Sequence, residues 1–382
     1  MRIAIDFTPA IAQNAGIGRY TRELVTALAQ VDAADRFTLF SSEPAVAGRE
    51  FPHAPNMRPR VFGVGNRRMT IVWQRLNVPL PAELLMGRAD VVHGPDFVLP
   101  PVLRARRVVT IHDLAFITHP ECAVPSLVRY LKTAVPRSVR AADRVIAVSQ
   151  RTADDLVRHM GTPREKISVI YLGISPGFTP QRDPEAIARM RARYGLAQPS
   201  VLAVGTIEPR KNYERLIAAF AEASRAPGGP RMLVIAGRKG WLFEGTFAAV
   251  ERYRVADAVR FLDFVPDENL LPLYQSADVL AMPSIYEGFG IPAVEAMAAG
   301  VPVVTSTGGS LPEIVGDAAV TVAPDDVDAL AAAILRLLTD AELRASLVQR
   351  GLRRASRFTW QAAAQAHVQV YHEVGGAARQ HG

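Results

Sequence analysis

Short runs of β-branched and other apolar residues alternate with helix-length amphipathic segments along this chain of 382 residues. The runs are continuously apolar instead of alternating in polarity, which indicates strands buried on both faces. Such strands form a parallel sheet whose faces are covered by the intervening helices. The alternation therefore predicts an α/β fold.

Nine runs are expected to be strands: Arg2–Asp6, Thr38–Phe40, Val91–His93, Val108–Ile111, Val145–Val148, Val201–Val204, Met232–Ala236, Val279–Met282 and Pro302–Val304. Helices are expected between them, among others at Gly18–Ala29, Arg151–Arg158, Tyr213–Glu222 and Asp328–Leu338.

The length of the chain exceeds one ordinary hydrophobic core and favours two domains. Glycines and prolines cluster at Tyr171–Pro184, which is the best boundary. Beyond this boundary the strand–helix alternation starts a second time. Leu202–Gly205 has the pattern of the first strand of a second domain and ends at a glycine. We expect two Rossmann-like domains, over residues 1–175 and 185–356, with ligands bound at the carboxyl ends of their strands.

The segment Glu287–Gly300 carries the strongest functional pattern. Gly288 and Gly290 follow the first carboxylate, Pro292 is expected to open a helix, and Glu295 is expected in its first turn. Glycines let backbone N–H groups approach a ligand closely, and a helix N-terminus favours phosphate. Carboxylates beside phosphate have to bind something else, such as sugar or ribose hydroxyls. The pattern indicates a nucleotide-sugar site, although the same residue types also serve ordinary helix capping.

This segment resembles the signature of glycosyltransferase family 4, a group of retaining enzymes with the GT-B fold. The similarity continues through Val301–Ser306, Gly308-Gly309 and Pro312–Ala319. It implies two Rossmann-like domains that face each other across a cleft, the first on the acceptor side and the second binding the nucleotide sugar. It also implies that the last helix crosses back, so that residues 357–374 pack on the N-terminal domain.

The resemblance extends to Gly205–Asn212, where Arg210 and Lys211 follow a strand-end glycine. Adjacent cations can bind a diphosphate, arginine in a bidentate manner. By the resemblance, both stabilise the departing nucleotide diphosphate, Glu287 binds hydroxyls of the donor sugar, and Glu295 binds the ribose diol.

Further donor contacts are implied by the resemblance alone. The backbone around Gly288, Phe289, Gly290 and Ile291 would face the diphosphate or the sugar. The nucleotide base would be held, largely by backbone contacts and packing, at Val265 and Leu270.

In the first half, the resemblance implies that Gly16 contacts the diphosphate and that Arg19 and Tyr20 lie on the acceptor side. It also places His112, at the end of the strand Val108–Ile111, beside the donor sugar. A lone histidine at a strand end is more often structural, so both interpretations of His112 stay open.

No metal and no cofactor are expected. The triplet Asp326-Val327-Asp328 resembles the Asp-X-Asp metal motif of the other glycosyltransferase fold, but it precedes a helix and is interpreted as its N-cap. Arg210 and Lys211 supply the positive charge that a leaving diphosphate needs. The nucleotide sugar would act as a co-substrate.

The formal net charge of +7 is unevenly distributed. Residues 1–170 contain 23 Lys and Arg against 15 Asp and Glu, and the remainder is nearly neutral. The excess favours an anionic partner for the first half. Nucleic acid is not expected, because no zinc-finger spacing or RNA-binding signature is present.

A basic amphipathic helix is expected around Arg129, Lys132, Arg137 and Arg140, with Pro136 as a candidate interruption. Its basic face either rests on an anionic membrane or is simply solvated. No apolar run reaches the ~18–20 residues of a membrane span. The single cysteine fits a reducing compartment, so we expect a cytoplasmic protein, with peripheral contact at the inner face of the membrane as a further expectation.

The expected function is retaining transfer of a sugar. The overall resemblance is strongest to bacterial mannosyl- and rhamnosyltransferases of surface polysaccharide synthesis, which implies a GDP-sugar, mannose or a related hexose. The acceptor would be a glycan or a polyprenyl-diphosphate-linked glycan. A UDP-sugar-dependent transferase and a GT-B-fold nucleotide-sugar epimerase are the alternatives. A nicotinamide-dependent dehydrogenase is not expected, because neither half has a Gly-rich fingerprint followed by an acid about 20 residues later.

Overall fold

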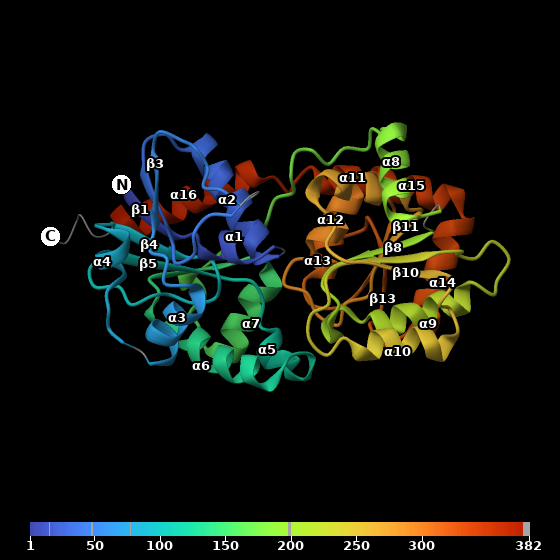
Figure 1. The fold of residues 1–382 in the computed structure, drawn as a ribbon, viewed down its shortest axis with the longest axis horizontal. Coiled ribbons are helices and arrows are strands. Elements are labelled where there is room, and N and C mark those ends of the chain that lie inside the picture. Colours follow the sequence, from blue (N-terminus) through green and yellow to red (C-terminus); the bar gives the residue numbers. More distant parts are fainter. Residues whose placement is uncertain (15, 47–48, 77, 198–199, 377–382) are drawn as a thin grey trace. The chain divides into compact units, whose positions relative to one another are not determined.

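The computed structural model describes residues 1–14, 16–46, 49–76, 78–197 and 200–376. The chain forms two compact units (Figure 1). Unit 1 comprises Met1–Leu114, Arg129–Gly173 and the chain from Thr359 onward, and unit 2 comprises Ala115–Val128 and Ile174–Phe358. Each unit is built on its own parallel sheet, so the predicted α/β class with two Rossmann-like sheets is confirmed.

Unit 1 contains a seven-stranded sheet in the order β3-β2-β1-β4-β5-β6-β7, with every recorded strand pair parallel. The strands are β1 (Arg2–Asp6), β2 (Arg36–Ser41), β3 (Met57–Val61), β4 (Val91–Gly94), β5 (Arg106–Ile111), β6 (Arg144–Ala147) and β7 (Ile167–Val169). The strand order reverses between β1 and β4, and the carboxyl ends at such a switch point form the usual ligand crevice of a parallel sheet.

The helices of unit 1 are α1 (Thr8–Ala12), α2 (Ile17–Val31), α3 (Asn66–Thr70), α4 (Ala82–Met86), α7 (Gln150–Met160) and α16 (Trp360–Gly376), with the short η1 (Ile71–Arg75) and η3 (Arg164–Lys166). Helix α6 (Pro125–Ala141) starts in the segment that belongs to unit 2 and continues into unit 1. It runs through Pro136 without a break, so the expected interruption there is wrong.

The last helix, α16, follows unit 2 in the chain but belongs to unit 1, where it packs on α2, β4 and β5. Its buried side chains recur at spacings of three and four residues, which makes one continuous stripe: Trp360, Ala364, His367, Tyr371 and Val374. The stripe explains why this helix packs on unit 1, as the crossing helix of the predicted fold does.

Unit 2 contains a six-stranded parallel sheet in the order β10-β9-β8-β11-β12-β13. The strands are β8 (Val201–Val204), β9 (Leu233–Ala236), β10 (Val259–Leu262), β11 (Val279–Met282), β12 (Val303–Ser306) and β13 (Val320–Val322). The switch point of this sheet lies between β8 and β11, because β8 is followed outward by β9 and β10 before the chain returns to β11.

The helices of unit 2 are α5 (Ala115–Thr118), α8 (Pro184–Tyr194), α9 (Tyr213–Ala223), α10 (Glu244–Tyr253), α11 (Asp267–Ser276), α12 (Ile291–Ala298), α13 (Leu311–Val315), α14 (Val327–Thr339) and α15 (Ala341–Ala355). Two short turns, η2 (Pro120–Cys122) and η4 (Pro209–Lys211), complete this unit.

The central strands of unit 2 are buried on both faces. Val201, Val279 and their neighbours two residues on pack in one core with α9, α10 and α14. The alternate residues, Leu202, Val234 and Leu280, are equally buried on the other face. This double burial is why the strands read as continuous apolar runs in the sequence.

Residues Ala115–Val128 belong to unit 2, although they fall inside the range 1–175 expected for the first domain. The limits 1–175, 185–356 and 357–374 themselves stay a prediction. None of the helices in the described part of the chain combines the length and hydropathy that a membrane span requires.

Candidate active site

Two loops at the switch point of unit 2 bring the predicted charged residues together. Arg210 and Lys211 follow β8, and Glu287 follows β11. The loops are joined by the backbone, where Ile285 N–H donates to the carbonyl of Arg210 at 2.8 Å. The side-chain amide of Asn212 adds a bond of 2.9 Å to the carbonyl of Pro283. The neighbouring parallel strands β8 and β11 thus fix both loops at one edge of the sheet.

Glu287 binds both cations with its two carboxylate oxygens. Lys211 Nζ lies 2.7 Å from Oε1, and an Arg210 guanidinium nitrogen lies 2.9 Å from Oε2. The other terminal nitrogen of Arg210 lies 2.5 Å from a carboxylate oxygen of Glu208. Two cationic and two carboxylate side chains therefore form one ion cluster.

This ion cluster is largely buried, since Glu208, Lys211 and Glu287 are each less than a tenth exposed. Burial by itself would raise the pKa of Glu287, but the charges of Arg210 and Lys211 outweigh it and hold that pKa at about 2. The Glu287 carboxyl is consequently ionised at neutral pH. The two cations are compensated in place, as buried charges have to be.

Two glycines keep the backbone close to this cluster. Gly205 has φ +147°, and a Cβ there would lie 3.0 Å from the side chain of Lys211. Gly309 has φ +64°, and its Cβ would lie 2.2 Å from the carbonyl oxygen of Glu287. Ser310 N–H then donates to that same carbonyl at 2.9 Å. The segment after β12 thus supports the Glu287 loop from behind, a contact that only glycine at position 309 allows.

The helix that was predicted to begin after Gly288 and Gly290 is present. Gly290, at φ +100°, caps α12, which begins at Ile291. Phe289 and Gly288 are buried, and the Phe289 carbonyl accepts a bond of 3.1 Å from the Ser310 hydroxyl. The backbone at these positions is therefore fixed in a defined conformation.

Glu295 is the fifth residue of α12 and lies at the start of its second turn, so the expected position in the first turn is wrong. Its side chain is only 1% exposed. One carboxylate oxygen accepts a hydrogen bond of 2.8 Å from the hydroxyl of Tyr274 on α11. The bond joins Glu295 to the helix whose first residues were expected to hold the base.

The expected base segment lies at the same edge of the sheet, after β10. Val265 and Leu270 are each 8% exposed and flank the start of α11. The neighbouring ring of Phe264 is 41% exposed, and the Arg238 guanidinium lies 4.9 Å from its centre. Since β8 to β11 are parallel, the loops after all four strands meet at one edge.

Two contacts near the ion cluster were not predicted from the sequence. The ring of His119 lies 5.3 Å from that of Tyr286, the residue before Glu287. The indole N–H of Trp241 donates to the Cys122 carbonyl at 2.8 Å. These contacts hold the segment Ala115–Val128 on unit 2. Burial, the larger cause, raises the pKa of the Cys122 thiol to about 11, so this thiol is protonated at neutral pH.

In unit 1, His112 directly follows β5. Its Nε2–H donates to the carbonyl of Pro95 at 2.8 Å, which places the proton on that nitrogen. The rings of Tyr20 and Phe97 lie edge-on at 4.8 and 5.5 Å. Burial lowers the pKa of His112, and the bond to Pro95 offsets this only in part. His112 is thus a neutral imidazole at neutral pH.

Gly16 is exposed at the start of α2, with φ +54° and open space where a Cβ would be. Arg19 is half-buried on the same helix. Tyr20 does not lie at the surface, and its place on the acceptor side stays a prediction. It is 2% exposed, and its hydroxyl bonds to Thr110 and His367.

Metal-ligating residues do not gather at either set of candidate residues within the described ranges. The Asp32, Asp35 and His372 side chains do approach one another in unit 1, where His372 Nε2 lies 2.6 Å from Asp35. The Asp326 carboxylate accepts from the N–H of Ala329 at 2.8 Å, so the triplet at 326–328 is the predicted N-cap.

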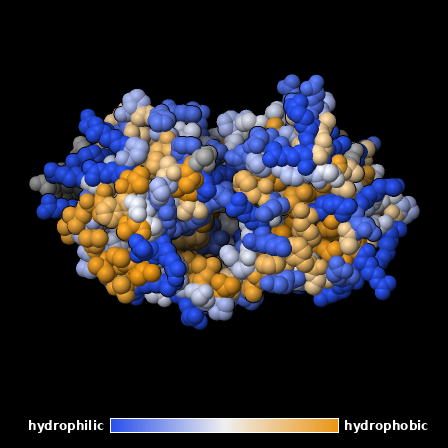
Figure 2. Space-filling view, viewed as in Figure 1, coloured by the Kyte–Doolittle hydropathy of each residue, from blue (hydrophilic) through white to orange (hydrophobic). Residues whose placement is uncertain are grey.

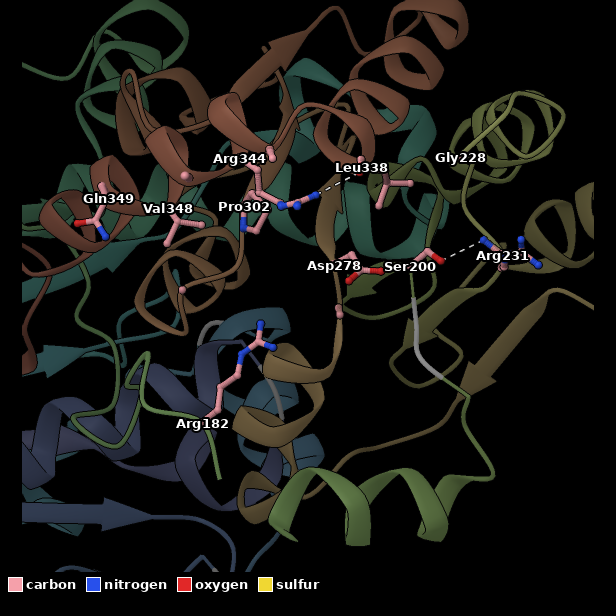
Figure 3. Close-up of a pocket in the computed structure, with 15 residues that line it drawn as sticks. Arg182, Ser200, Gly228, Arg231, Asp278, Pro302, Leu338, Arg344, Val348 and Gln349 are labelled. Atoms are coloured by element: carbon pink, nitrogen blue, oxygen red, sulfur yellow. Dashed lines mark hydrogen bonds between the residues drawn. The ribbon is translucent and has the colours of Figure 1, made fainter. Parts of the chain in front are cut away.

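A hollow of about 840 Å³ lies at the opposite edge of the unit 2 sheet (Figure 3). Ser200, Asp278 and Pro302, which immediately precede β8, β11 and β12, line it. Arg344 points across it and donates to the Leu338 carbonyl. Because this hollow is at the amino ends of the strands, it is separate from the cluster around Glu287.

Comparisons with known proteins agree with the geometry. The family described as "Glycosyltransferase Family 4" matches residues 14–178, and the family described as "Glycosyl transferases group 1" matches residues 188–354. O-antigen chain mannosyltransferase B of Escherichia coli is 35% identical over 374 residues, which cover 94% of this chain and 97% of that protein.

Solved structures share the fold. Sucrose-phosphate synthase of Thermosynechococcus elongatus matches with a TM-score of 0.80 at 23% identity, over 99% of this chain and 100% of that one. HepE of Anabaena in complex with UDP-glucose matches with a TM-score of 0.74 at 21% identity, over 97% and 99%. On these similarities, the chain belongs to glycosyltransferase family 4 and is a hexosyltransferase with the GT-B fold, in the family of the O-antigen mannosyltransferase.

Proposed function

We propose that this enzyme transfers mannose or a related hexose from a GDP-sugar onto a glycan or polyprenyl-diphosphate-linked glycan during surface polysaccharide synthesis. The observation that carries the proposal is the buried cluster of Arg210, Lys211 and Glu287 at the switch point of unit 2. The choice of mannose is supported by the 35% identity to an O-antigen chain mannosyltransferase.

The ion cluster suits a diphosphate leaving group. Arg210 and Lys211 are held in place by Glu208 and Glu287, so their charges are preorganised before a donor arrives. A diphosphate would supply new negative charge to both cations. Glu287 would then be released to accept hydrogen bonds from hydroxyls of the donor sugar.

The other proposed contacts to the donor lie at the same edge of the unit 2 sheet. Glu295, oriented by Tyr274, would bind the ribose diol, and Val265 and Leu270 would flank the base. The backbone from Gly288 to Ile291, at the N-terminus of α12, would face the diphosphate or the sugar.

The residues of unit 1 have separate roles in this proposal. Gly16 would contact the diphosphate and Arg19 would serve the acceptor side. His112 would lie beside the donor sugar, where its neutral ring can accept a hydrogen bond.

The proposed reaction proceeds with retention of configuration. The acceptor hydroxyl attacks the face of the sugar from which the diphosphate departs, and a phosphate oxygen takes the hydroxyl proton. Arg210 and Lys211 stabilise the charge that develops on the leaving group, a contribution of several kcal/mol. The proposal requires neither a metal nor another cofactor.

The surface of unit 1 supports the proposal that the acceptor is lipid-linked. The side chains of Arg129, Lys132, Arg137 and Arg140 are exposed and share one face of α6 at helical spacing. Large apolar side chains are also exposed in the earlier part of unit 1: Val61, Phe62, Leu76, Val78, Leu84 and Leu103.

Figure 2 shows apolar residues gathered on the part of unit 1 that carries α4. Basic and apolar surfaces in one unit suit a peripheral position on an anionic bilayer that holds the lipid-linked acceptor. We therefore place the enzyme in the cytoplasm, in contact with the inner face of the membrane, with no nucleic-acid partner.

A UDP-sugar is the second candidate donor, because HepE of Anabaena, with which the chain shares its fold, binds UDP-glucose. A transfer assay separates the two. We expect sugar transfer from GDP-mannose to isolated lipid-linked glycans, unchanged by a metal chelator. Transfer only from UDP-glucose would overturn the donor, and loss of activity with the chelator would overturn metal independence. Isomerisation of GDP-mannose without any acceptor would identify an epimerase instead.

A further inference from the structure

Five buried side chains of unit 1 form one continuous chain of hydrogen bonds. Tyr371 bonds to His93 Nδ1 at 2.8 Å, and His93 Nε2 bonds to Thr110 Oγ1 at 2.9 Å. Thr110 bonds to the Tyr20 hydroxyl at 3.0 Å, and that hydroxyl bonds to His367 Nε2 at 2.9 Å. All five residues are at most 2% exposed. The chain joins α2, β4, β5 and α16.

One backbone carbonyl sets the direction of every bond in this chain. His367 Nδ1 lies 2.8 Å from the carbonyl of Ala363, which can only accept, so Nδ1 carries the proton. In a neutral imidazole, Nε2 must then accept from the Tyr20 hydroxyl. It follows that Thr110 donates to Tyr20, His93 Nε2 donates to Thr110, and Tyr371 donates to His93 Nδ1.

The neutral state that this assignment requires agrees with the surroundings of the two histidines. Burial lowers the pKa of His367 to about 4 and places that of His93 well below its usual value. Every hydroxyl and imidazole donor in the chain therefore has an acceptor, with no net charge. Fully satisfied buried networks of this kind hold their members in a single arrangement.

Tyr20 connects this network to His112. Its ring lies 4.8 Å from the imidazole of His112 at an interplanar angle of 84°, an edge-on contact. On the imidazole itself, Nε2–H is fixed by the Pro95 carbonyl, and Phe97 contributes a second edge-on ring. The Tyr20 ring is thus the one part of the five-residue chain with a recorded ring contact to His112 among the described residues.

We propose that the C-terminal helix α16, through His367, fixes the Tyr20 ring and thereby sets the orientation of the His112 imidazole for sugar transfer. Tyr20 and His367 are positioning residues that touch no substrate. The inference rests on the proposed place of His112 beside the donor sugar. It gives α16 a part in catalysis in addition to its packing on unit 1.

The hydrogen-bond chain contains a second tyrosine, Tyr371, which serves as a matched control for Tyr20. Tyr371→Phe removes a buried hydroxyl from the far end, at a residue whose recorded ring contacts are to His93 and His367. Tyr20→Phe removes a hydroxyl of the same kind from the residue whose ring contacts His112. A purely structural role predicts similar effects of both changes on every property.

The test measures kcat and the donor KM of both variants with GDP-mannose, together with their melting temperatures. We expect similar losses of thermal stability. Only Tyr20→Phe should lower kcat, by roughly tenfold with the donor KM unchanged, because misoriented catalytic groups cost turnover more than binding. His367→Ala should reproduce that change, and the double variant should be no worse than either single one, since both break the same bond.

Equal kcat values for Tyr20→Phe and Tyr371→Phe would overturn the proposal. The variant His112→Ala separates this failure from a failure of the proposed function. Wild-type turnover in His112→Ala would refute the role of His112 itself. A large loss in His112→Ala, combined with equal values in the two tyrosine variants, would refute only the positioning by Tyr20.

Discussion

Lys211 and Glu287 lie 76 positions apart in the chain, yet Nζ of one is 2.7 Å from Oε1 of the other. Both side chains are about nine-tenths buried. Breaking a buried ion pair by removing one partner leaves an uncompensated charge, which costs about 3–5 kcal/mol. The pair is therefore a functional and a structural contact at once, and variants of its members need both activity and stability measurements.

Lys211→Ala should reduce sugar transfer by roughly a hundredfold or more, because one preorganised charge contact to the leaving group is lost. Arg210 still compensates Glu287 in this variant, so the protein should remain folded at room temperature. Initial rates with GDP-mannose and circular dichroism check both expectations. Lys166→Ala, a change of the same type in unit 1, should leave the rate near that of the wild type.

Glu287→Gln should make the free energy of unfolding vary less with pH in the acid range. The folded-state pKa of Glu287, about 2, lies below its usual value near 4.5, so its ionised form contributes stability above pH 4.5. That contribution is lost as pH falls from 4.5 towards 2.

Urea unfolding of wild type and Glu287→Gln at several pH values between 6 and 3 measures this effect. The stability advantage of the wild type should be constant above pH 5 and shrink below it. A difference that does not change with pH would show that the carboxylate is not stabilised by the two cations.

Glu208→Ala should weaken catalysis although the sequence assigned no role to this residue. Its carboxylate lies 2.5 Å from the terminal nitrogen of Arg210 that does not bind Glu287. We expect roughly a tenfold lower kcat/KM, smaller than for Lys211→Ala, because Arg210 keeps its bonds to Glu287 and to the Tyr286 carbonyl. Steady-state kinetics beside the exposed control Glu222→Ala give the answer, and equal values for both variants would contradict it.

Gly309→Ala should impair both folding and turnover. The new Cβ would lie 2.2 Å from the Glu287 carbonyl, and the residue would keep a positive φ that alanine disfavours. Melting temperature and transfer rate should both fall, whereas Gly177→Ala, where nothing lies within 4 Å of the new Cβ, should change neither. An active and stable Gly309→Ala protein would show that the Glu287 loop tolerates displacement.

The sequence predicted the central strands of both sheets but missed their edge strands. All nine expected strands are present, and the four that were missed, β3, β7, β10 and β13, are the edge strands of the two sheets. β3 shows why: it reads Met-Arg-Pro-Arg-Val, and only Met57 is buried. Edge strands need no continuous apolar run, so the pattern that identifies central strands does not reach them.

At the candidate site, the resemblance to glycosyltransferase family 4 implied that Arg210, Lys211 and Glu287 belong to one site, and the structure brings their side chains together. The sequence did not predict the part of Glu208, because a carboxylate next to two cations is common on solvated loops. The burial of Tyr20 was not predicted for a related reason. On an amphipathic helix a tyrosine suits the surface and the core equally, and its buried partner His367 lies 347 positions away.

Calorimetric titration with GDP, UDP and ADP tests the central claim most directly, namely that the edge of unit 2 around Glu287 and Glu295 binds the nucleotide of a GDP-sugar. The account predicts selective binding of GDP, lost in Glu295→Ala and retained in the exposed control Glu342→Ala. Selective binding of UDP would keep the site and contradict the donor, and binding of none of the three would contradict the nucleotide site itself.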